Sequence, residues 1–210
     1  MSALPTYKKM LQPGKTEYEV AWHIDSWLRQ RGYSSAFDPI VAVNEHAAVP
    51  HFNTLRDGKK RIGHNAIALI DVGARVNNYC SDISRMFVVG KPSTIFMNSY
   101  TNMLKIQEQT IQQLGTCKKY CEVDTYCREE LKKVGITPHA HATGHGIGID
   151  VHEKPYISSH SKDTIVPGHV VTIEPGTYID NKFGIRIEDT IYIDEDHNPT
   201  QLTKYPKRIA

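Results

Sequence analysis

The sequence lacks any apolar run long enough to cross a membrane. Nowhere in its 210 residues do 18 apolar positions follow one another, the length that a spanning helix needs. The opening segment, MSALPTYKKM, also has no apolar core of the kind found in secretory signals. We therefore expect no membrane association and a cytoplasmic location.

The chain also lacks a large excess of charge of either sign. Its 25 Lys and Arg residues against 23 Asp and Glu residues give a formal net charge of +2. Proteins that neutralise the phosphates of a duplex usually carry a clear basic excess, so nucleic acid is not an expected partner. With 23% charged and 40% hydrophobic residues, the composition is that of an ordinary globular protein, which excludes disorder.

Cysteine is scarce, and its spacing does not form a zinc knuckle. The four cysteines are Cys80, Cys117, Cys121 and Cys127. No Cys-x2-Cys pair occurs among them, so a structural zinc site is not indicated. A chain of this length buries enough core to be stable without disulfides. We therefore expect reduced thiols on or near helices.

Hydrophobic periodicity predicts amphipathic helices alternating with short strands. Thr16 and Glu19 form a capping box that starts a helix, and Gly32 ends it. Two more helices are expected at 94–114 and 123–134, the second of them ended by Gly135. Strands are expected at 39–43, 67–72, 86–89, 170–173, and 185–188 continuing to 191–193. This order predicts an α+β domain.

A repeat is visible in the spacing of the chain. From Gly32 to Asp71 is 39 residues, and from Gly135 to Glu174 is also 39 residues. In each half a second acidic residue follows 11 or 14 positions later. This predicts two α+β halves related by a pseudo-twofold axis, with carboxylates meeting at the centre. Because residue identity between the halves is negligible, coincidence is the alternative.

Four acidic residues lie in segments that otherwise read as core strands: Asp71, Asp82, Glu174 and Glu188. An unpaired carboxylate there costs several kcal/mol. Turn capping explains one such residue but not the whole set. Together with the histidine-rich segment ATGHGIGIDVHE, they predict a polycarboxylate metal site with one imidazole ligand. Two divalent ions about 3.5 to 4 Å apart would balance the charge.

Four segments carry a resemblance to a known superfamily: DVGARVNNYCSDISR, HATGHGIGIDVHEKP, VTIEPGTYI and GIRIEDT. Over residues 11–203 the sequence resembles the creatinase and methionine aminopeptidase superfamily of dinuclear metallopeptidases. Its GIRIED and IDVHEKPYIS motifs are closer to Xaa-Pro aminopeptidases and Xaa-Pro dipeptidases (prolidases) than to methionine aminopeptidases. The resemblance implies the pita-bread fold, in which two pseudo-symmetric α+β halves surround a central antiparallel sheet.

The resemblance also implies a metal-ligand set. The ligands would be Asp71, Asp82, His145, Glu174 and Glu188, with Asp82 and Glu188 bridging two divalent ions. Manganese is the ion we expect first, with cobalt, zinc and iron as alternatives. All five residues are present, which argues against the non-catalytic members of the superfamily.

Three histidines and one acid take catalytic roles by the same resemblance. His51 and His152 match histidines that bind the substrate and the tetrahedral intermediate, and His141 matches a further active-site histidine. A metal-bridging hydroxide is the expected nucleophile, and Glu174 would pass its proton to the leaving nitrogen. A histidine beside the developing oxyanion supplies a preorganised donor.

Other residues near the motifs have supporting or neutral roles. Arg186 lies on the same strand face as Glu188 and is expected to hold a ligand acid in place. Tyr178 is expected either to donate to a bridging carboxylate or to pack as a core tyrosine. His46 is a weaker candidate for the substrate pocket. The remaining histidines considered are expected at the surface or in loops: His64, His139, His160, His169 and His197.

We expect residues 1–210 to form one metallopeptidase catalytic domain, without the N-terminal domain that proline-specific relatives usually carry. The chain is either a natural minimal form or a fragment, and a homodimer is left open. The expected reaction is hydrolysis of the bond between an N-terminal residue and proline, with peptides as substrates. The alternatives are a methionine aminopeptidase and a catalytically inactive module that binds peptides or proteins.

Overall fold

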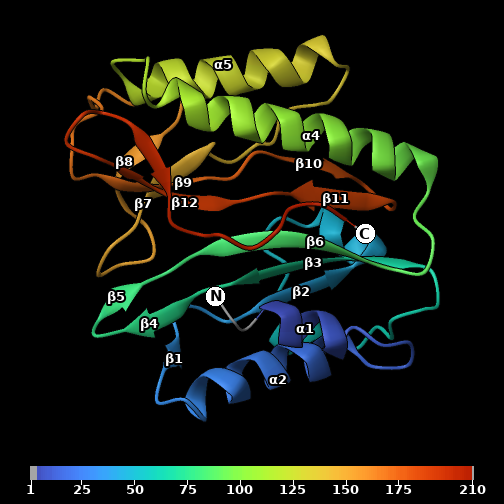
Figure 1. The fold of residues 1–210 in the computed structure, drawn as a ribbon. Coiled ribbons are helices and arrows are strands. Elements are labelled where there is room, and N and C mark those ends of the chain that lie inside the picture. The colour runs from blue at the N-terminus through green and yellow to red at the C-terminus, as the bar shows by residue number, and fades with distance from the viewer. Residues whose placement is uncertain (1–3, 210) are drawn as a thin grey trace.

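The computed structural model describes residues 4–209, and Figure 1 shows their fold. The helices are α1 (Leu4–Met10), α2 (Glu17–Arg29), α3 (Thr54–Asp57), α4 (Thr94–Gln113) and α5 (Tyr120–Lys133), with a 3-10 helix η1 (Asn44–Ala48). The first strands are β1 (Ser34–Ser35), β2 (Ile40–Val43), β3 (Ala66–Val72), β4 (Ala74–Val76), β5 (Tyr79–Cys80) and β6 (Ile83–Val89). The later strands are β7 (Gly144–Gly146), β8 (Glu153–Ile157), β9 (Val170–Ile173), β10 (Gly176–Ile179), β11 (Phe183–Arg186), β12 (Asp189–Ile193) and β13 (Pro199–Gln201).

Two sheets with the same internal order form the centre of the molecule. The first has the order β2-β3-β6, and the second, β13-β12-β9-β7-β8, contains the equivalent order β7-β9-β12. All of these pairings are antiparallel. A hairpin, β4-β5 or β10-β11, is inserted before the last strand of each set. The topology confirms the predicted α+β class and the internal repeat.

The helices cover the sheets from opposite sides (Figure 1). On one side α2 buries Val20 and Ile24 in a cluster with Val41 and Ile70 of the first sheet. On the other side, residues of α4 and α5 pack on the second sheet, with Val123 in a cluster that includes Val171, Ile173 and Ile191. The apolar side chains thus pack between helices and sheets, and buried polar residues such as Ser84 and Glu188 lie where the two halves meet.

Both of the predicted helix stops have the same geometry. Gly32 and Gly135 adopt positive φ angles of 76° and 75°, which glycine reaches without a steric penalty. At each glycine the N–H donates to the carbonyl three residues back, and the next N–H donates to the carbonyl five residues back. This is the Schellman arrangement. The capping box of Thr16 and Glu19 at the start of α2 is also present.

One predicted strand is interrupted. We expected an unbroken strand through Glu188, but β11 ends at Arg186 and β12 begins at Asp189. The chain changes partner here, because β11 pairs with β10 whereas β12 pairs with β9. At the break, the Glu188 N–H donates to the Ser84 carbonyl of the first half at 3.2 Å. The acid therefore lies where the two halves are joined.

The cysteines are free, as predicted. Cys121 and Cys127 lie in α5 and Cys117 follows α4, as expected. Cys80 differs from the prediction, because it lies on strand β5 and not on or near a helix. Its thiol contacts the carbonyl of Ile149 at 3.3 Å. Among residues 4–209, no helix combines the length and the apolarity needed to cross a bilayer.

Candidate active site

One cavity of about 430 Å³ is lined by all five residues that were predicted as metal ligands. They come from both halves of the fold and lie on strands or beside their ends: Asp71 on β3, Asp82 just before β6, His145 on β7, Glu174 just after β9 and Glu188 just before β12. Three of the four acids occupy breaks between strands. At such a break the side chain is free of the alternation that a continuous strand imposes.

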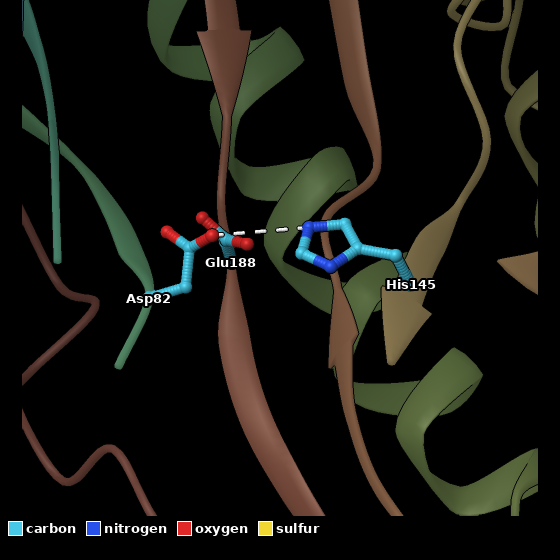
Figure 2. Close-up of side chains that lie close together, drawn as sticks. All are labelled: Asp82, His145 and Glu188. Carbon is cyan, nitrogen blue, oxygen red and sulfur yellow. Dashed lines mark ion pairs between the residues drawn. The ribbon is translucent and has the colours of Figure 1, made fainter. Parts of the chain in front are cut away.

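The imidazole of His145 points at the carboxylates (Figure 2). Its Nε2 lies 3.4 Å from Glu174 Oε1 and 3.8 Å from Asp82 Oδ2. The Nδ1–H donates to the Gly146 carbonyl at 3.0 Å, which leaves the Nε2 lone pair facing the acids. Ligand atoms of Asp82, His145 and Glu188 all lie within 4.8 Å of one another.

The two glycines beside His145 allow the β7 backbone to lie close to its neighbours. A Cβ on Gly144 would collide with the carbonyl of Thr172, and one on Gly146 would collide with the carbonyl of Lys154. The Gly-His-Gly sequence therefore reflects tight packing of β7 between β9 and β8, and not a phosphate-binding loop.

The donor set fits divalent cations. Asp71 Oδ1 and Asp82 Oδ1 are buried and lack a hydrogen-bond partner among the described residues. Burying a carboxylate oxygen without a hydrogen-bond partner costs free energy of folding. None of the described donors around the cavity bonds to either oxygen. Carboxylates with one neutral imidazole suit Mn, Co, Fe or Zn.

Without a cation, the site strongly disfavours its own negative charge. Burial, reinforced by the neighbouring carboxylates, raises the pKa of Asp82 and of Glu188 well above the usual range. Burial also raises the pKa of Glu174 to about 8, against the opposing effect of Arg186. The pKa of His145 falls to about 4, mainly through burial, so its imidazole is neutral at pH 7 and can act as a ligand.

Arg186 contacts one predicted ligand directly and another through a serine. Its Nη2 donates to Asp71 Oδ2 at 2.6 Å and its Nε donates to Ser84 Oγ at 2.9 Å. The Ser84 hydroxyl then donates to Glu188 Oε2 at 2.9 Å. Sequence reasoning missed Ser84. The available signal was a polar residue two positions after Asp82 at the start of an apolar strand, and the structure shows that this serine is fully buried and hydrogen-bonded.

Tyr178 contacts a histidine and an arginine. One of its two expected roles was to donate to a bridging carboxylate, and its hydroxyl makes no such contact among the described residues. Its hydroxyl accepts from Arg186 Nη1 at 3.1 Å and lies 2.8 Å from His141 Nε2. The His141 Nδ1–H donates to the Ala142 carbonyl at 2.7 Å, so Nε2 accepts the Tyr178 proton. Burial lowers the pKa of His141 to about 3. His141 also lines the cavity.

The outer histidines lie at the mouth of the cavity. His51 and His152 are exposed and line it. The His152 ring centroid is 4.3 Å from that of His145. His46 lies outside the lining and instead pairs with buried Glu17 at 2.9 Å.

His139, which we expected at the surface or in a loop, lies in a loop but is buried. The residue is only 3% exposed, and its ring stacks on that of His141, with centroids 4.5 Å apart. A loop has no helical or strand periodicity, so the sequence around His139 could not predict that the residue is buried. His169 is half-buried and bonded to the Tyr120 hydroxyl at 2.8 Å. The other three are exposed, as predicted: His64, His160 and His197.

Known proteins are similar to this chain in sequence and in fold. The chain is 36% identical over 198 residues to the Xaa-Pro dipeptidase of Pyrococcus furiosus, which covers 93% of the chain and 56% of that relative. The X-Pro aminopeptidase of Thermotoga maritima superposes with a TM-score of 0.92 at 32% identity, covering 99% of this chain and 58% of that one. The prolidase of Pyrococcus horikoshii gives 0.93 at 33% identity, covering 100% and 60%.

The chain therefore spans little more than half the length of the relatives it matches. These neighbours confirm the predicted pita-bread fold. The family model for metallopeptidase family M24 matches residues 1–195, which is most of the chain. The protein belongs to metallopeptidase family M24.

Proposed function

We propose that this domain hydrolyses the bond between an N-terminal residue and a following proline. The observation that carries the proposal is the convergence of four carboxylates and the His145 imidazole in one cavity, where two buried carboxylate oxygens lack a hydrogen-bond partner within residues 4–209. The similarity to proteins named Xaa-Pro dipeptidase and X-Pro aminopeptidase supports the substrate class.

The proposed site holds two divalent ions, with manganese the first candidate. Asp71, Asp82, His145, Glu174 and Glu188 would hold them, because four convergent carboxylates exceed the charge that one divalent ion can balance. When bound, the ions supply Lewis acidity and lower the pKa of the water that attacks the scissile carbonyl.

The side chains of the domain perform the proton transfers and hold the substrate. Glu174 lines the cavity, with its Oε1 3.4 Å from His145 Nε2. It would take a proton from the attacking water and pass it to the leaving nitrogen. His152 and His51, at the cavity mouth, would donate to the carbonyl oxygen as negative charge develops on it.

The cavity also suits the ring that follows the cleaved bond. A proline nitrogen is a tertiary amide with no N–H and a restrained φ angle, so it is bound through apolar contact and not through a donor. Phe37, Pro39, Ile40 and Phe52 line the cavity and offer an apolar surface for such a ring.

The test is hydrolysis by manganese-loaded protein of a peptide panel containing Xaa-Pro, Xaa-Pro-Xaa and Met-Ala-Xaa sequences. We expect release of the first residue only when proline follows it, and no release by a His145→Ala variant. Release of Met from Met-Ala peptides without action before proline would instead identify a methionine aminopeptidase. Metal binding without hydrolysis of any peptide would support a binding module. Sizing of the active species distinguishes a monomer from a homodimer.

A further inference from the structure

A buried chain of polar groups runs from α5 toward the cavity. Asp124 and Thr143 are both fully buried. The Thr143 hydroxyl donates to Asp124 Oδ1 at 2.7 Å, and Arg128 Nε donates to Asp124 Oδ2 at 2.7 Å. Buried polar chains of this kind hold one arrangement when every member is satisfied. None of these residues lines the cavity.

The direction of these bonds fixes the protonation of His139. Because the Thr143 proton goes to the Asp124 carboxylate, the Thr143 oxygen must accept from His139 Nε2–H, which lies 3.2 Å away. His139 Nδ1 lies 3.2 Å from both the nitrogen and the carbonyl oxygen of Gly176. With the proton on Nε2, Nδ1 carries a lone pair and accepts the Gly176 N–H. His139 is therefore the Nε2–H tautomer, held at both ring nitrogens.

His141 rests on this assembly. Its ring stacks on His139 with an interplanar angle of 29°. Arg128 donates to the His139 carbonyl at 2.8 Å and to the His141 carbonyl at 2.7 Å. The far edge of the His141 ring accepts from the Tyr178 hydroxyl. The His141 imidazole is thus held by the stacked His139 ring and by the Tyr178 hydroxyl, and Arg128 of α5 holds the backbone of both histidines.

We propose that Thr143 is a positioning residue for His141. Its hydroxyl is fixed by Asp124 and in turn accepts from His139 Nε2–H, which fixes the His139 ring. The stacked His139 ring then sets the ring plane of His141 in the cavity. Thr143 does not line the cavity. Its backbone carbonyl accepts the Glu174 N–H at 2.8 Å, a contact that a side-chain substitution leaves in place, so the hydroxyl acts through the two histidines. The catalytic part of this inference rests on the proposed function, whereas the geometric part does not.

The kinetic test compares Thr143→Val, which removes the hydroxyl at constant shape, with Thr143→Ser, which keeps it. With an Xaa-Pro-Xaa peptide we expect Thr143→Val to lower kcat about tenfold, with metal content and KM little changed, and Thr143→Ser to restore it. In a His141→Ala background, Thr143→Val should cause no further loss. Equal losses in the two backgrounds, or none in either, overturn the proposal.

A second measurement does not depend on activity. In zinc-loaded protein, imidazole ¹⁵N resonances should show His139 protonated at Nε2 and His141 at Nδ1. Thr143→Val should shift the His141 resonances and mix its tautomers, and Thr143→Ser should leave them unchanged. Unaltered His141 resonances in Thr143→Val overturn the proposal even if the kinetics change. If no Xaa-Pro peptide is cleaved, the proposed function fails, and this spectrum alone decides the positioning role.

Discussion

Arg186 engages only one oxygen of Asp71: its Nη2 lies 2.6 Å from Oδ2, while the buried Oδ1 has no partner among the described residues. The carboxylate is thereby fixed in orientation and partly compensated in charge, yet it keeps a free oxygen. Glu188 is oriented in a similar way, by the Ser84 hydroxyl on Oε2. A carboxylate held by one oxygen can bind a cation with the other, which is the role proposed for both acids.

Removing Arg186 should destabilise the metal-free protein. Arg186→Met leaves Asp71 buried without its cation, and breaking one side of a buried pair costs about 3 to 5 kcal/mol. Denaturant unfolding at pH 7 measures the loss. The matched control is Arg56→Met, since Arg56 pairs with Asp57 on the surface, and it should leave the midpoint unchanged. Equal midpoints for Arg186→Met and wild type would contradict the role given to this pair.

Removing Asp82 should have opposite effects with and without metal. The raised pKa of Asp82 means that its charge is unfavourable in the metal-free fold, so Asp82→Asn should raise the Tm of the metal-free protein. The same change should abolish the gain in Tm on adding manganese. Elemental analysis should find two ions per wild-type chain, and well under one would refute the ligand set. Glu129→Gln, an exposed acid on α5, is the control.

The pH dependence of the metal-free protein combines two opposing groups. The histidines His139, His141 and His145 have lowered pKa values of about 4, 3 and 4, so their contribution to stability is present above 6.5 and is lost as the pH falls. Glu174, with its pKa raised from 4.5 to about 8, contributes stability that is present at low pH and is lost as the pH rises through about 8. Asp82 and Glu188 act in the same direction as Glu174.

The Tm of the metal-free protein should therefore change little between about pH 4.5 and 6.5, where the two groups oppose each other, and fall between about pH 6.5 and 8, where only the acids still titrate. Bound divalent ions stabilise the ionised acids, so the fall should vanish in the loaded protein. Scanning calorimetry in matched buffers makes the comparison. A rising Tm above pH 6.5 without metal would be inconsistent with these buried acids.

The role of His152 should be separable from that of His145, the proposed imidazole ligand. His152→Ala is expected to keep the full metal content and to lower kcat/KM on the order of a hundredfold, the scale of losing one oxyanion donor. His145→Ala should lose metal and activity together. Metal analysis and kinetics on the same samples decide the point. Loss of metal in His152→Ala would show that this residue is a ligand.

The charge of the cavity predicts a preference among proline substrates. Of its described lining residues, Arg186 is the only Lys or Arg, and its N–H groups already serve Asp71, Ser84, Tyr178 and the Pro50 carbonyl. The carboxylate of an Xaa-Pro dipeptide therefore finds no free cation there. Ala-Pro-amide, which has the same size without the charge, should be cleaved about tenfold faster in kcat/KM. Equal rates would refute the argument.

The sequence predicted best those residues whose chemical type differs from that of their immediate neighbours. Acids such as Asp71 and Glu174 stood out because their neighbours are apolar, and Gly32 and Gly135 stood out because they end periodic segments. The break before Glu188 was missed because apolar residues continue on both sides of it, and only the change of strand partner creates it. Asp124 was missed for another reason: a polar residue on an amphipathic helix looks exposed until the loop that covers it is known.

The strand break at Glu188, whose N–H is bonded to Ser84 in the other half, has a thermodynamic consequence. Each half contributes two of the four acids, so neither half alone presents the complete set of proposed ligands. Ion binding and docking of the halves are then linked equilibria, and every gain in affinity for the ion is also a gain in the cohesion of the two halves. A denaturant that separates the halves should release the ions in the same transition, and a chelator should loosen the junction before the outer helices unfold.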